Sequence, residues 1–159
     1  MKRQDYLSWD EYFMGLAILS SQRSKDPSTQ VGACIVNSEL KIVSVGYNGA
    51  PRGYDDDKDM TWERSGDFLD TKYAYVCHSE LNAILNSNMS VKNCKLYVTL
   101  FPCNECAKVI IQSGIKEIVY LSDKYEGTKE NIAAKKIFDV CGVKYREYKK
   151  QNKEIKIEL

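Results

Sequence analysis

The sequence predicts an α/β fold in which helices cover both faces of a five-stranded mixed sheet. Apolar runs of strand length alternate with helical patterns in the second half of the chain, which indicates right-handed crossovers and parallel strands. Two adjacent apolar runs near the N-terminus are separated by a short polar turn, which indicates an antiparallel hairpin. The length of 159 residues, 43% of them hydrophobic, is enough for one domain and too short for two ordinary ones.

A capping box begins the first predicted helix, because Ser8 is followed three residues later by Glu11. Apolar side chains then recur at helical spacing, which predicts a helix from about residue 9 to 22 with one apolar face. The members of this face are Trp9, Tyr12, Phe13, Leu16, Ala17 and Leu19.

A hairpin and a long loop are expected next. Residues 31–36 and 42–47 are apolar runs on either side of the polar turn 37–41, and they predict two paired strands. Residues 48–77 carry glycines, a proline, several aromatics and a run of acids. We therefore expect this loop to be functional or mobile, as loops of this length in a compact domain usually are.

Helices and strands alternate from residue 78 to residue 148. Leu81, Ile84 and Leu85 mark one face of a short helix, and a later helix ends before Gly114. A third helix in this half ends at Gly142. The expected strands are 96–100, 117–121 and 143–148, and the expected third helix is 129–140. Two helices in this half begin at the chemically informative segments described next.

The short runs "HSE" and "PCNEC" carry the residue types of a hydrolytic zinc site. His78 is the only histidine of the chain, and Cys103 and Cys106 form a Cys-x-x-Cys pair after Pro102. Zinc favours imidazole and thiolate ligands in a tetrahedron, and a catalytic site leaves one corner for water. Thiolates near a helix N-terminus are also favoured by the helix dipole. We therefore expect these three side chains to bind one zinc ion.

Glu80 is the expected catalytic acid and base. It follows His78 by two residues, which places it in a first helical turn beside the metal without coordinating it. A carboxylate in reach of an activated water can take its proton and pass it to ring nitrogen 3 of a cytosine while the water oxygen attacks carbon 4. His-x-Glu followed by Pro-Cys-x-x-Cys is the signature of zinc-dependent deaminases.

A closed structural zinc site is the alternative that the cysteines leave open. Its fourth ligand would be Cys34, Cys77, Cys94 or Cys141. A closed site has no use for a carboxylate beside the metal, so Glu80 favours the catalytic interpretation. Free cysteines are commonly buried, so Cys34, Cys94 and Cys141 are expected to act as small apolar residues of the core. Cys77 is expected to point away from the metal.

Composition and charge argue for a small substrate. Lys plus Arg is 23 and Asp plus Glu is 22, for a formal net charge of +1, which offers no general attraction for a polyanion. No apolar run is long enough to cross a bilayer, and the first residues lack an apolar signal segment. We therefore expect a cytoplasmic protein with reduced thiols that binds neither nucleic acid nor membrane.

Beyond the zinc motif, longer stretches of the chain resemble the deoxycytidylate deaminase family of the cytidine deaminase-like superfamily. The resemblance lies in "EYFMGLAILSSQRSKDPSTQVGACIVN", "VGYNGAPRG", "YVCHSELNAI", "LFPCNECAKVIIQSGIKEIVY" and "SDKY", and it spans about residues 5–148. It implies a three-layer α/β/α fold and hydrolysis of dCMP to dUMP and ammonia, which supplies dUMP for thymidylate synthesis. It also implies a homohexamer that is activated by dCTP and inhibited by dTTP. Within residues 1–159 we thus expect a single deaminase domain.

The resemblance also implies roles for residues outside the metal motif. Asn48 would contact the sugar, and Tyr125 would border the substrate. Arg23 and Lys25 are our candidates for the 5′ phosphate, because a guanidinium or an ammonium suits this group. From the residues alone, exposed loop charges and an ordinary turn asparagine are equally good interpretations of these positions.

The "GYNGAPRG" segment resembles the family's regulatory nucleotide site. Its candidate residues are Gly46, Asn48, Gly49, Arg52 and Gly53, because glycines let the backbone approach phosphates and the arginine offers a charge. Magnesium is a further candidate, as a companion of the regulatory nucleotide. Some phage members bind a second zinc through His and Cys in the long insertion. Residues 50–76 contain neither, so one zinc per chain is expected.

Two other functions share parts of this pattern. A deaminase acting on cytosine or adenine in RNA or single-stranded DNA would use the same metal chemistry, but it would need a basic groove with stacking aromatics. A non-catalytic deaminase fold could serve as a nucleotide sensor. Such a protein has no chemical reason to keep Glu80 beside a complete ligand set.

Overall fold

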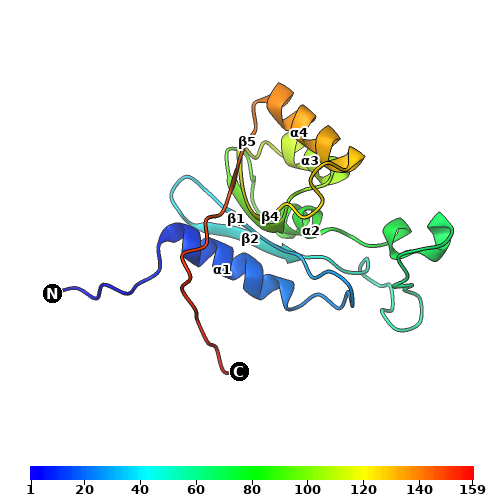
Figure 1. Cartoon of the computed structure of the whole chain (residues 1–159), viewed down its shortest axis with the longest axis horizontal. Helices are drawn as coiled ribbons and strands as arrows, with labels where there is room; N and C mark the ends of the chain where they lie inside the picture. Colours follow the sequence, from blue (N-terminus) through cyan, green and yellow to red (C-terminus); the bar gives the residue numbers. More distant parts are fainter.

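Five strands form one mixed sheet in the computed structural model, which describes residues 1–159 (Figure 1). The strand order is β2-β1-β3-β4-β5. The strands are β1 (Gly32–Val36), β2 (Ile42–Tyr47), β3 (Lys95–Leu100), β4 (Glu117–Ser122) and β5 (Lys144–Glu147). β1 is antiparallel to both β2 and β3, whereas β3, β4 and β5 are parallel. The predicted mixed sheet with an N-terminal hairpin is therefore confirmed.

Helices cover both faces of this sheet, which makes three layers. The helix α1 (Trp9–Ser21) lies on one face, and α2 (Ser79–Asn86), α3 (Asn104–Gln112) and α4 (Lys129–Cys141) lie on the other (Figure 1). The period-2 alternation of strand side chains divides the core into two clusters. In β1, Ala33 and Ile35 pack with α2, α3 and α4, and Cys34 and Val36 pack under α1.

The first helix begins as predicted but buries a narrower face. The Ser8 hydroxyl accepts from the Glu11 backbone N–H, and the Glu11 side chain accepts from the Ser8 N–H, so both halves of the capping box are present. Phe13 and Ala17 are buried, as expected. Three members of the predicted apolar face, Trp9, Tyr12 and Leu19, are exposed, because only the stripe turned toward β1 and β3 is covered. Trp9 is 56% exposed.

The second half of the chain agrees with the predicted elements to within one or two residues at each end. Gly142 ends α4 with φ of 70°, a left-handed conformation that favours glycine. Cys34 and Cys94 are buried as expected. The expectation for Cys141 is wrong: its position in the last turn of α4 faces solvent, since α4 packs through Ala134 and Phe138.

Residues 48–77 form an insertion that extends beyond the end of the sheet (Figure 1). It contains two 3-10 turns, η1 (Phe68–Asp70) and η2 (Lys72–Ala74). Its two ends are joined by an antiparallel bridge between Gly49 and Cys77. The residue after this bridge is His78, so the base of the insertion is attached directly to the predicted metal site. None of the helices is both long and apolar enough to span a membrane.

Candidate active site

The two predicted zinc segments meet at one end of the sheet. β3 runs parallel to β4, and the chain leaves β3 through the buried Phe101 and Pro102 to reach Cys103, the N-cap residue of α3. His78 is the N-cap residue of α2. The carboxyl ends of parallel strands are the usual location of ligand sites in α/β folds. Two helix N-termini, with their unpaired N–H groups, therefore converge at this end.

His78, Cys103 and Cys106 form one cluster of candidate metal ligands, with their ligand atoms within 4.8 Å of one another. The Nδ1 atom of His78 lies 3.5 Å from the Cys103 sulfur and 3.4 Å from the Cys106 sulfur. Zinc bonds of the usual length at a tetrahedral angle would separate a nitrogen and a sulfur by roughly 3.6 Å. The residues present therefore fit a tetrahedral zinc ion, with Nδ1 as the imidazole ligand.

The cluster contains three ligands and no fourth side chain. The cysteines considered for a closed site, Cys34, Cys77, Cys94 and Cys141, do not belong to it. Three protein ligands and one free corner are the arrangement of catalytic zinc sites.

Without metal, the three ligands share protons among themselves. Hydrogen bonds from Cys106 and His78 lower the pKa of Cys103 to about 4, against the opposing effect of burial. The hydrogen bond with Cys103 raises the pKa of His78 to about 9. The hydrogen bond to Cys103 and burial raise the pKa of Cys106. A bound cation would have to displace these protons, so metal binding at this cluster is coupled to proton release.

Glu80 lies in the first turn of α2 and is only 4% exposed. The Ser79 hydroxyl donates to its Oε2 atom at 3.0 Å. Burial raises the pKa of Glu80, although the His78 charge opposes this. A raised pKa makes the ionised carboxyl group a stronger base, which favours the uptake of a proton that a proton shuttle needs.

Close packing of α2 on β2 positions both His78 and Glu80. A Cβ atom at Gly46 of β2 would lie 2.4 Å from the Ala83 backbone nitrogen. Asn82 of α2 donates to the Tyr47 carbonyl oxygen at 2.7 Å, next to this contact. In the structure, Gly46, which the sequence makes a candidate for approach to a phosphate, packs against the α2 backbone.

The structure places the four candidate substrate residues at different depths. Asn48 is buried, with its side chain hydrogen-bonded to the segment before β1. Arg23 lies over the Tyr47 ring at 5.8 Å, and Lys25 is ion-paired with Asp56. Tyr125 is 40% exposed in the loop after β4.

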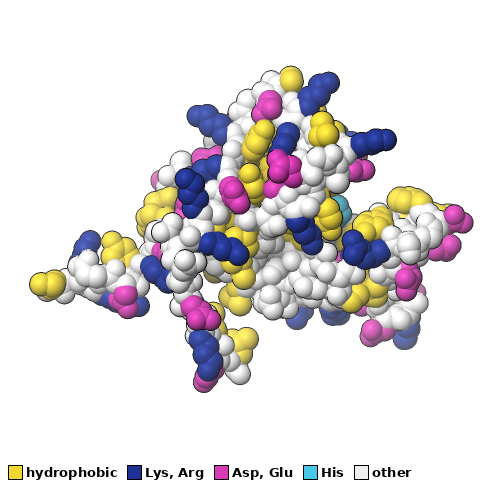
Figure 2. All heavy atoms as spheres, viewed as in Figure 1, with side chains coloured by type: hydrophobic (Ala, Val, Ile, Leu, Met, Phe, Trp, Pro, Cys, Tyr) yellow, Lys and Arg dark blue, Asp and Glu magenta, His cyan; other side chains and the backbone are white.

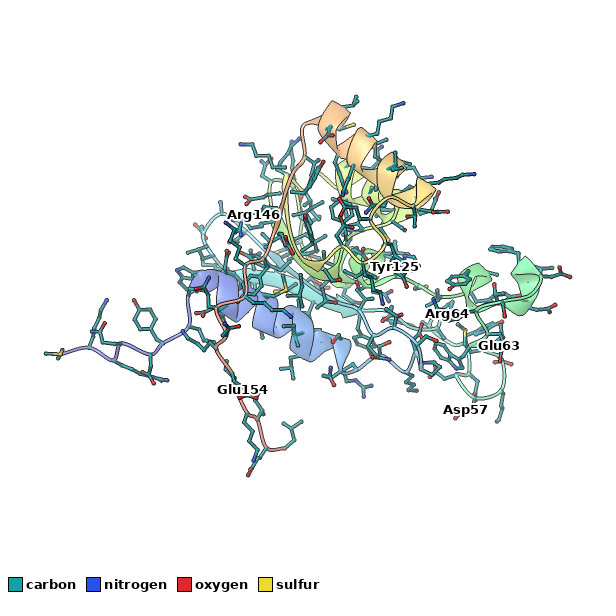
Figure 3. The ribbon with its side chains drawn as sticks, viewed as in Figure 1. Asp57, Glu63, Arg64, Tyr125, Arg146 and Glu154 are labelled. Atoms are coloured by element: carbon teal, nitrogen blue, oxygen red, sulfur yellow. The ribbon has the colours of Figure 1, made fainter.

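Figure 3 shows Tyr125 on the side of the body that faces the insertion, near Arg64. Arg64 donates to the Tyr73 hydroxyl at 3.3 Å. The loop after β4 and the insertion therefore approach each other near the candidate site.

The candidate regulatory segment is a turn at the start of the insertion. Gly49 is held by the bridge to Cys77, Arg52 is exposed, and Gly53 has φ of 89°. No atom approaches within 4 Å of an added Cβ at Gly49 or Gly53. On the face of the molecule that Figure 2 shows, basic and acidic side chains are interspersed, and acidic side chains gather on the insertion.

Two residues near the site were missed by sequence reasoning. Asp26 and Lys72 form a buried ion pair of 2.6 Å. Asp26 looks like an ordinary turn residue before Pro27, and Lys72 stands close to an acidic run that suggests a solvated surface. The two lie 46 positions apart in the sequence, so no local pattern could have paired them.

Comparison with protein families matches residues 7–122 to the cytidine and deoxycytidylate deaminase zinc-binding region. A deoxycytidylate deaminase of Pongo abelii is 61% identical over 149 residues, which cover 92% of this chain and 83% of that protein. A deoxycytidylate deaminase of Mus musculus is 58% identical over 160 residues, which cover 99% of this chain and 89% of that protein.

A solved structure has the same architecture. The dCMP deaminase of the cyanophage S-TIM5, in complex with dCMP and dUMP, matches with a TM-score of 0.72 and 25% identity, over 90% of this chain and all of that chain. The matched family region includes β1 to β4, the His78 segment and both cysteines of the candidate metal cluster. By its sequence, its three-layer fold and its cluster of one histidine and two cysteines, this chain belongs to the cytidine and deoxycytidylate deaminase family.

Proposed function

We propose that this protein catalyses the hydrolytic deamination of dCMP to dUMP and ammonia. The observation that carries the proposal is the meeting of three metal-ligand atoms and the buried Glu80 carboxyl group at one end of the sheet. Substrate identity is supported by the relatives named deoxycytidylate deaminase, whose matched regions cover 83% and 89% of their own lengths.

We further propose that His78, Cys103 and Cys106 hold one zinc ion. When bound, zinc supplies a Lewis acid that makes a water molecule nucleophilic at neutral pH. The donor set of one imidazole and two thiols is the soft set that zinc prefers, and its spacing fits a tetrahedron.

Glu80 moves the protons of the reaction. It first accepts a proton from the attacking water and gives it to ring nitrogen 3, while the water oxygen bonds to carbon 4 of the cytosine. It then passes the second water proton to the exocyclic amine, the bond from carbon 4 to that nitrogen breaks, and ammonia leaves. Burial and the hydrogen bond from Ser79 hold the Glu80 carboxyl group in one orientation for both transfers.

For the substrate, we propose that Asn48 contacts the sugar and that Tyr125 borders the base. Arg23 and Lys25 stay candidates for the 5′ phosphate. Arg23 has no carboxylate partner, which leaves its guanidinium free, whereas Lys25 would have to leave Asp56.

Regulation and assembly belong to the same proposal. Activation by dCTP and inhibition by dTTP at the segment of Gly46, Asn48, Gly49, Arg52 and Gly53 stay predictions. So do the accompanying magnesium, the homohexamer, the supply of dUMP for thymidylate synthesis, the single-domain organisation and the cytoplasmic location. The regulation, the magnesium, the hexamer and the supply of dUMP are supported by the resemblance, and the single-domain organisation is supported by the length of the chain.

Replacing Glu80 by Gln tests the mechanism directly. The amide keeps the shape but cannot accept the proton, so turnover should fall by about 10²- to 10⁴-fold. Zinc content, measured by metal analysis, should stay near one per chain. The matched control is Glu105→Gln, which removes an exposed carboxylate from the first turn of α3 and should leave turnover unchanged. Turnover of the Glu80→Gln variant equal to that of the natural protein would refute the proposed role.

Ammonia release from a set of substrates tests the specificity. We expect release from dCMP, and much less from deoxycytidine, CMP, dCTP or a cytosine-containing oligonucleotide. Adding dTTP or dCTP to the dCMP reaction tests the regulatory prediction in the same assay. A zinc-loaded protein that is inactive on dCMP would overturn the proposed function.

A further inference from the structure

The buried ion pair of Lys72 and Asp26 has no part in the proposed proton transfers. Lys72 Nζ lies 2.6 Å from Asp26 Oδ2, and their side chains are 6% and 2% exposed. Lys72 belongs to η2 in the insertion, and Asp26 belongs to the segment between α1 and β1. The pair therefore joins the base of the insertion to the body of the protein.

Burying two charges costs free energy that their attraction does not reliably offset, so a buried ion pair is weak evidence for a role in stability alone. Asp26 is nevertheless completely hydrogen-bonded. Its Oδ1 atom accepts from the backbone N–H groups of Ser28 and Thr29, at 2.8 and 3.1 Å. Its Oδ2 atom accepts from Lys72 and, at 3.4 Å, from the side-chain amide of Asn48. The consequence of this network is a fixed Asn48.

The Asn48 amide has one hydrogen-bonding position left. Its Nδ2 atom donates to the Thr29 carbonyl oxygen at 2.9 Å and to Asp26, which uses both of its hydrogens. Its Oδ1 atom accepts from the Val31 backbone N–H at 2.8 Å, and an amide oxygen can accept two hydrogen bonds. A flipped amide would face its NH₂ group to the Val31 N–H and its oxygen to the Asp26 carboxylate, and both contacts would be repulsive.

Asn48 lies beside the candidate active site. The next residue, Gly49, is bridged to Cys77, which directly precedes His78. The only free capacity of the Asn48 side chain is thus one acceptor site on Oδ1, adjacent to the metal segment. In a deoxynucleotide 5′-monophosphate, the sugar has a single free hydroxyl group, at the 3′ position, and this hydroxyl is a donor.

We propose that Lys72 and Asp26 are positioning residues that hold the Asn48 amide with its oxygen toward the 3′ hydroxyl of the substrate. This inference rests on the proposed function, because it names the substrate contact that the ion pair sets. Lys72 donates to Asp26 Oδ2 from one side and so holds the carboxylate in place to accept from Asn48 on the other. Through Lys72, the insertion then influences recognition of the sugar, although Lys72 itself does not touch the substrate.

The test compares dCMP with 2′,3′-dideoxycytidine 5′-monophosphate, which lacks the hydroxyl. For the natural protein we expect kcat/KM to be about 10-fold or more higher for dCMP, as for the loss of a partner to a buried polar group. In Lys72→Met this ratio should fall below about 3-fold, with KM for dCMP raised more than kcat is lowered. Lys72→Arg keeps the charge and a donor, and it should retain most of the discrimination.

Arg146→Met is the matched control for a merely structural effect. Arg146 makes a two-point ion pair with Asp10, at 2.7 and 2.9 Å, and neither residue belongs to the candidate site. Its loss should lower the Tm and leave the ratio between the two nucleotides unchanged. If Lys72→Met shows the ratio of the natural protein, the inference is overturned.

A double variant covers the case in which Lys72→Met does not fold. Asp26→Asn with Lys72→Met removes both charges, which costs less than leaving one of them buried and unpaired. The amide oxygen introduced at position 26 would still accept from the Ser28 and Thr29 backbone N–H groups. The new NH₂ group would then face the Asn48 Nδ2 atom, and because both groups are donors, the orientation of Asn48 would be disrupted. The ratio should again fall below about 3-fold, and an undiminished ratio in this folded variant would refute the inference. Absence of ammonia release from dCMP by the natural protein would instead count against the proposed function.

Discussion

Replacing Gly46 by Ala should separate α2 from β2 and so displace His78 and Glu80, the proposed metal ligand and proton carrier at the start of α2. A Cβ atom at residue 46 would lie 2.4 Å from the Ala83 nitrogen, 2.5 Å from the Ser79 carbonyl oxygen and 2.8 Å from the Ala83 Cα atom. All three are backbone atoms of α2, so no side chain can rotate away to make room. The helix itself has to move.

The required displacement follows from these distances. Nonbonded heavy atoms prefer separations of about 3.5 Å or more, so α2 must move by roughly 1 Å. Overpacking of this kind costs about 1–3 kcal/mol of unfolding free energy. For a chain of this size each kcal/mol lowers the Tm by about 2–4 °C, so a decrease of roughly 2–12 °C is expected. A misplacement of about 1 Å at reacting groups can cost about 10²-fold in rate, and we expect kcat/KM to fall by that order.

Thermal unfolding, deamination of dCMP and metal analysis measure these effects together. The matched control is Gly15→Ala in α1, where no atom lies within 4 Å of the added Cβ. An alanine in a helix interior is favoured over glycine, so this variant should gain stability by about 0.5–1 kcal/mol and keep its activity. If Gly46→Ala is as stable and active as the natural protein, the packing role assigned to Gly46 is incorrect.

Three further outcomes are expected. Replacing Cys103 by Ala, or removing metal with a chelator, should abolish activity and lower the Tm, because metal binding and folding are coupled. Adding zinc back should rescue only the chelated protein, which a metal titration followed by thermal unfolding would show. Replacing Asn82 by Ala should cost about 0.5–1.5 kcal/mol in urea unfolding, since its amide joins α2 to the Tyr47 carbonyl oxygen, and an unchanged midpoint would contradict this. Burial alone would raise the pKa of Asp10, but hydrogen bonds from Tyr97 and Arg146 outweigh it and hold this pKa below its ordinary value of 3.8. Its folded pKa is thus below its unfolded one, so its contribution to stability is present above about pH 4 and is lost as the pH falls through the folded pKa. Urea unfolding between pH 5 and pH 3 should show a smaller loss of stability for Asp10→Asn than for the natural protein, and equal losses would refute this assignment.

The cluster of candidate metal ligands and most elements could be predicted because their signals are local. His78 and Glu80 are two positions apart, and Cys103 and Cys106 are three apart, so each half of the site is set by a few neighbouring residues at a helix start. The Ser8 capping box and the helix end at Gly142 are equally local, and both are confirmed. Periodicity was less reliable for the exposure of single residues such as Trp9, because it identifies an apolar stripe without saying how much of the stripe is covered.

The role of Gly46 and the orientation of Asn48 could not be predicted in this way. Gly46 looks like part of a glycine-rich nucleotide loop, whereas its environment is the backbone of α2, a helix that begins only at Ser79. Asn48 looks like a turn residue, whereas its side-chain partners lie 17 to 22 positions earlier in the chain, in the segment before β1. These contacts exist only after the sheet and α2 have come together.

The residue types at short spacing predicted the α/β architecture, the candidate metal cluster and the candidate proton carrier, because helix starts, strand alternation and ligand chemistry act over a few residues. Folding added the relations between distant segments: which glycine lies against α2, how Lys72 reaches Asp26, and which atom of Asn48 stays free. Hydrogen bonds and steric contacts act over a few ångströms in space regardless of sequence separation, and so only the folded chain could decide them.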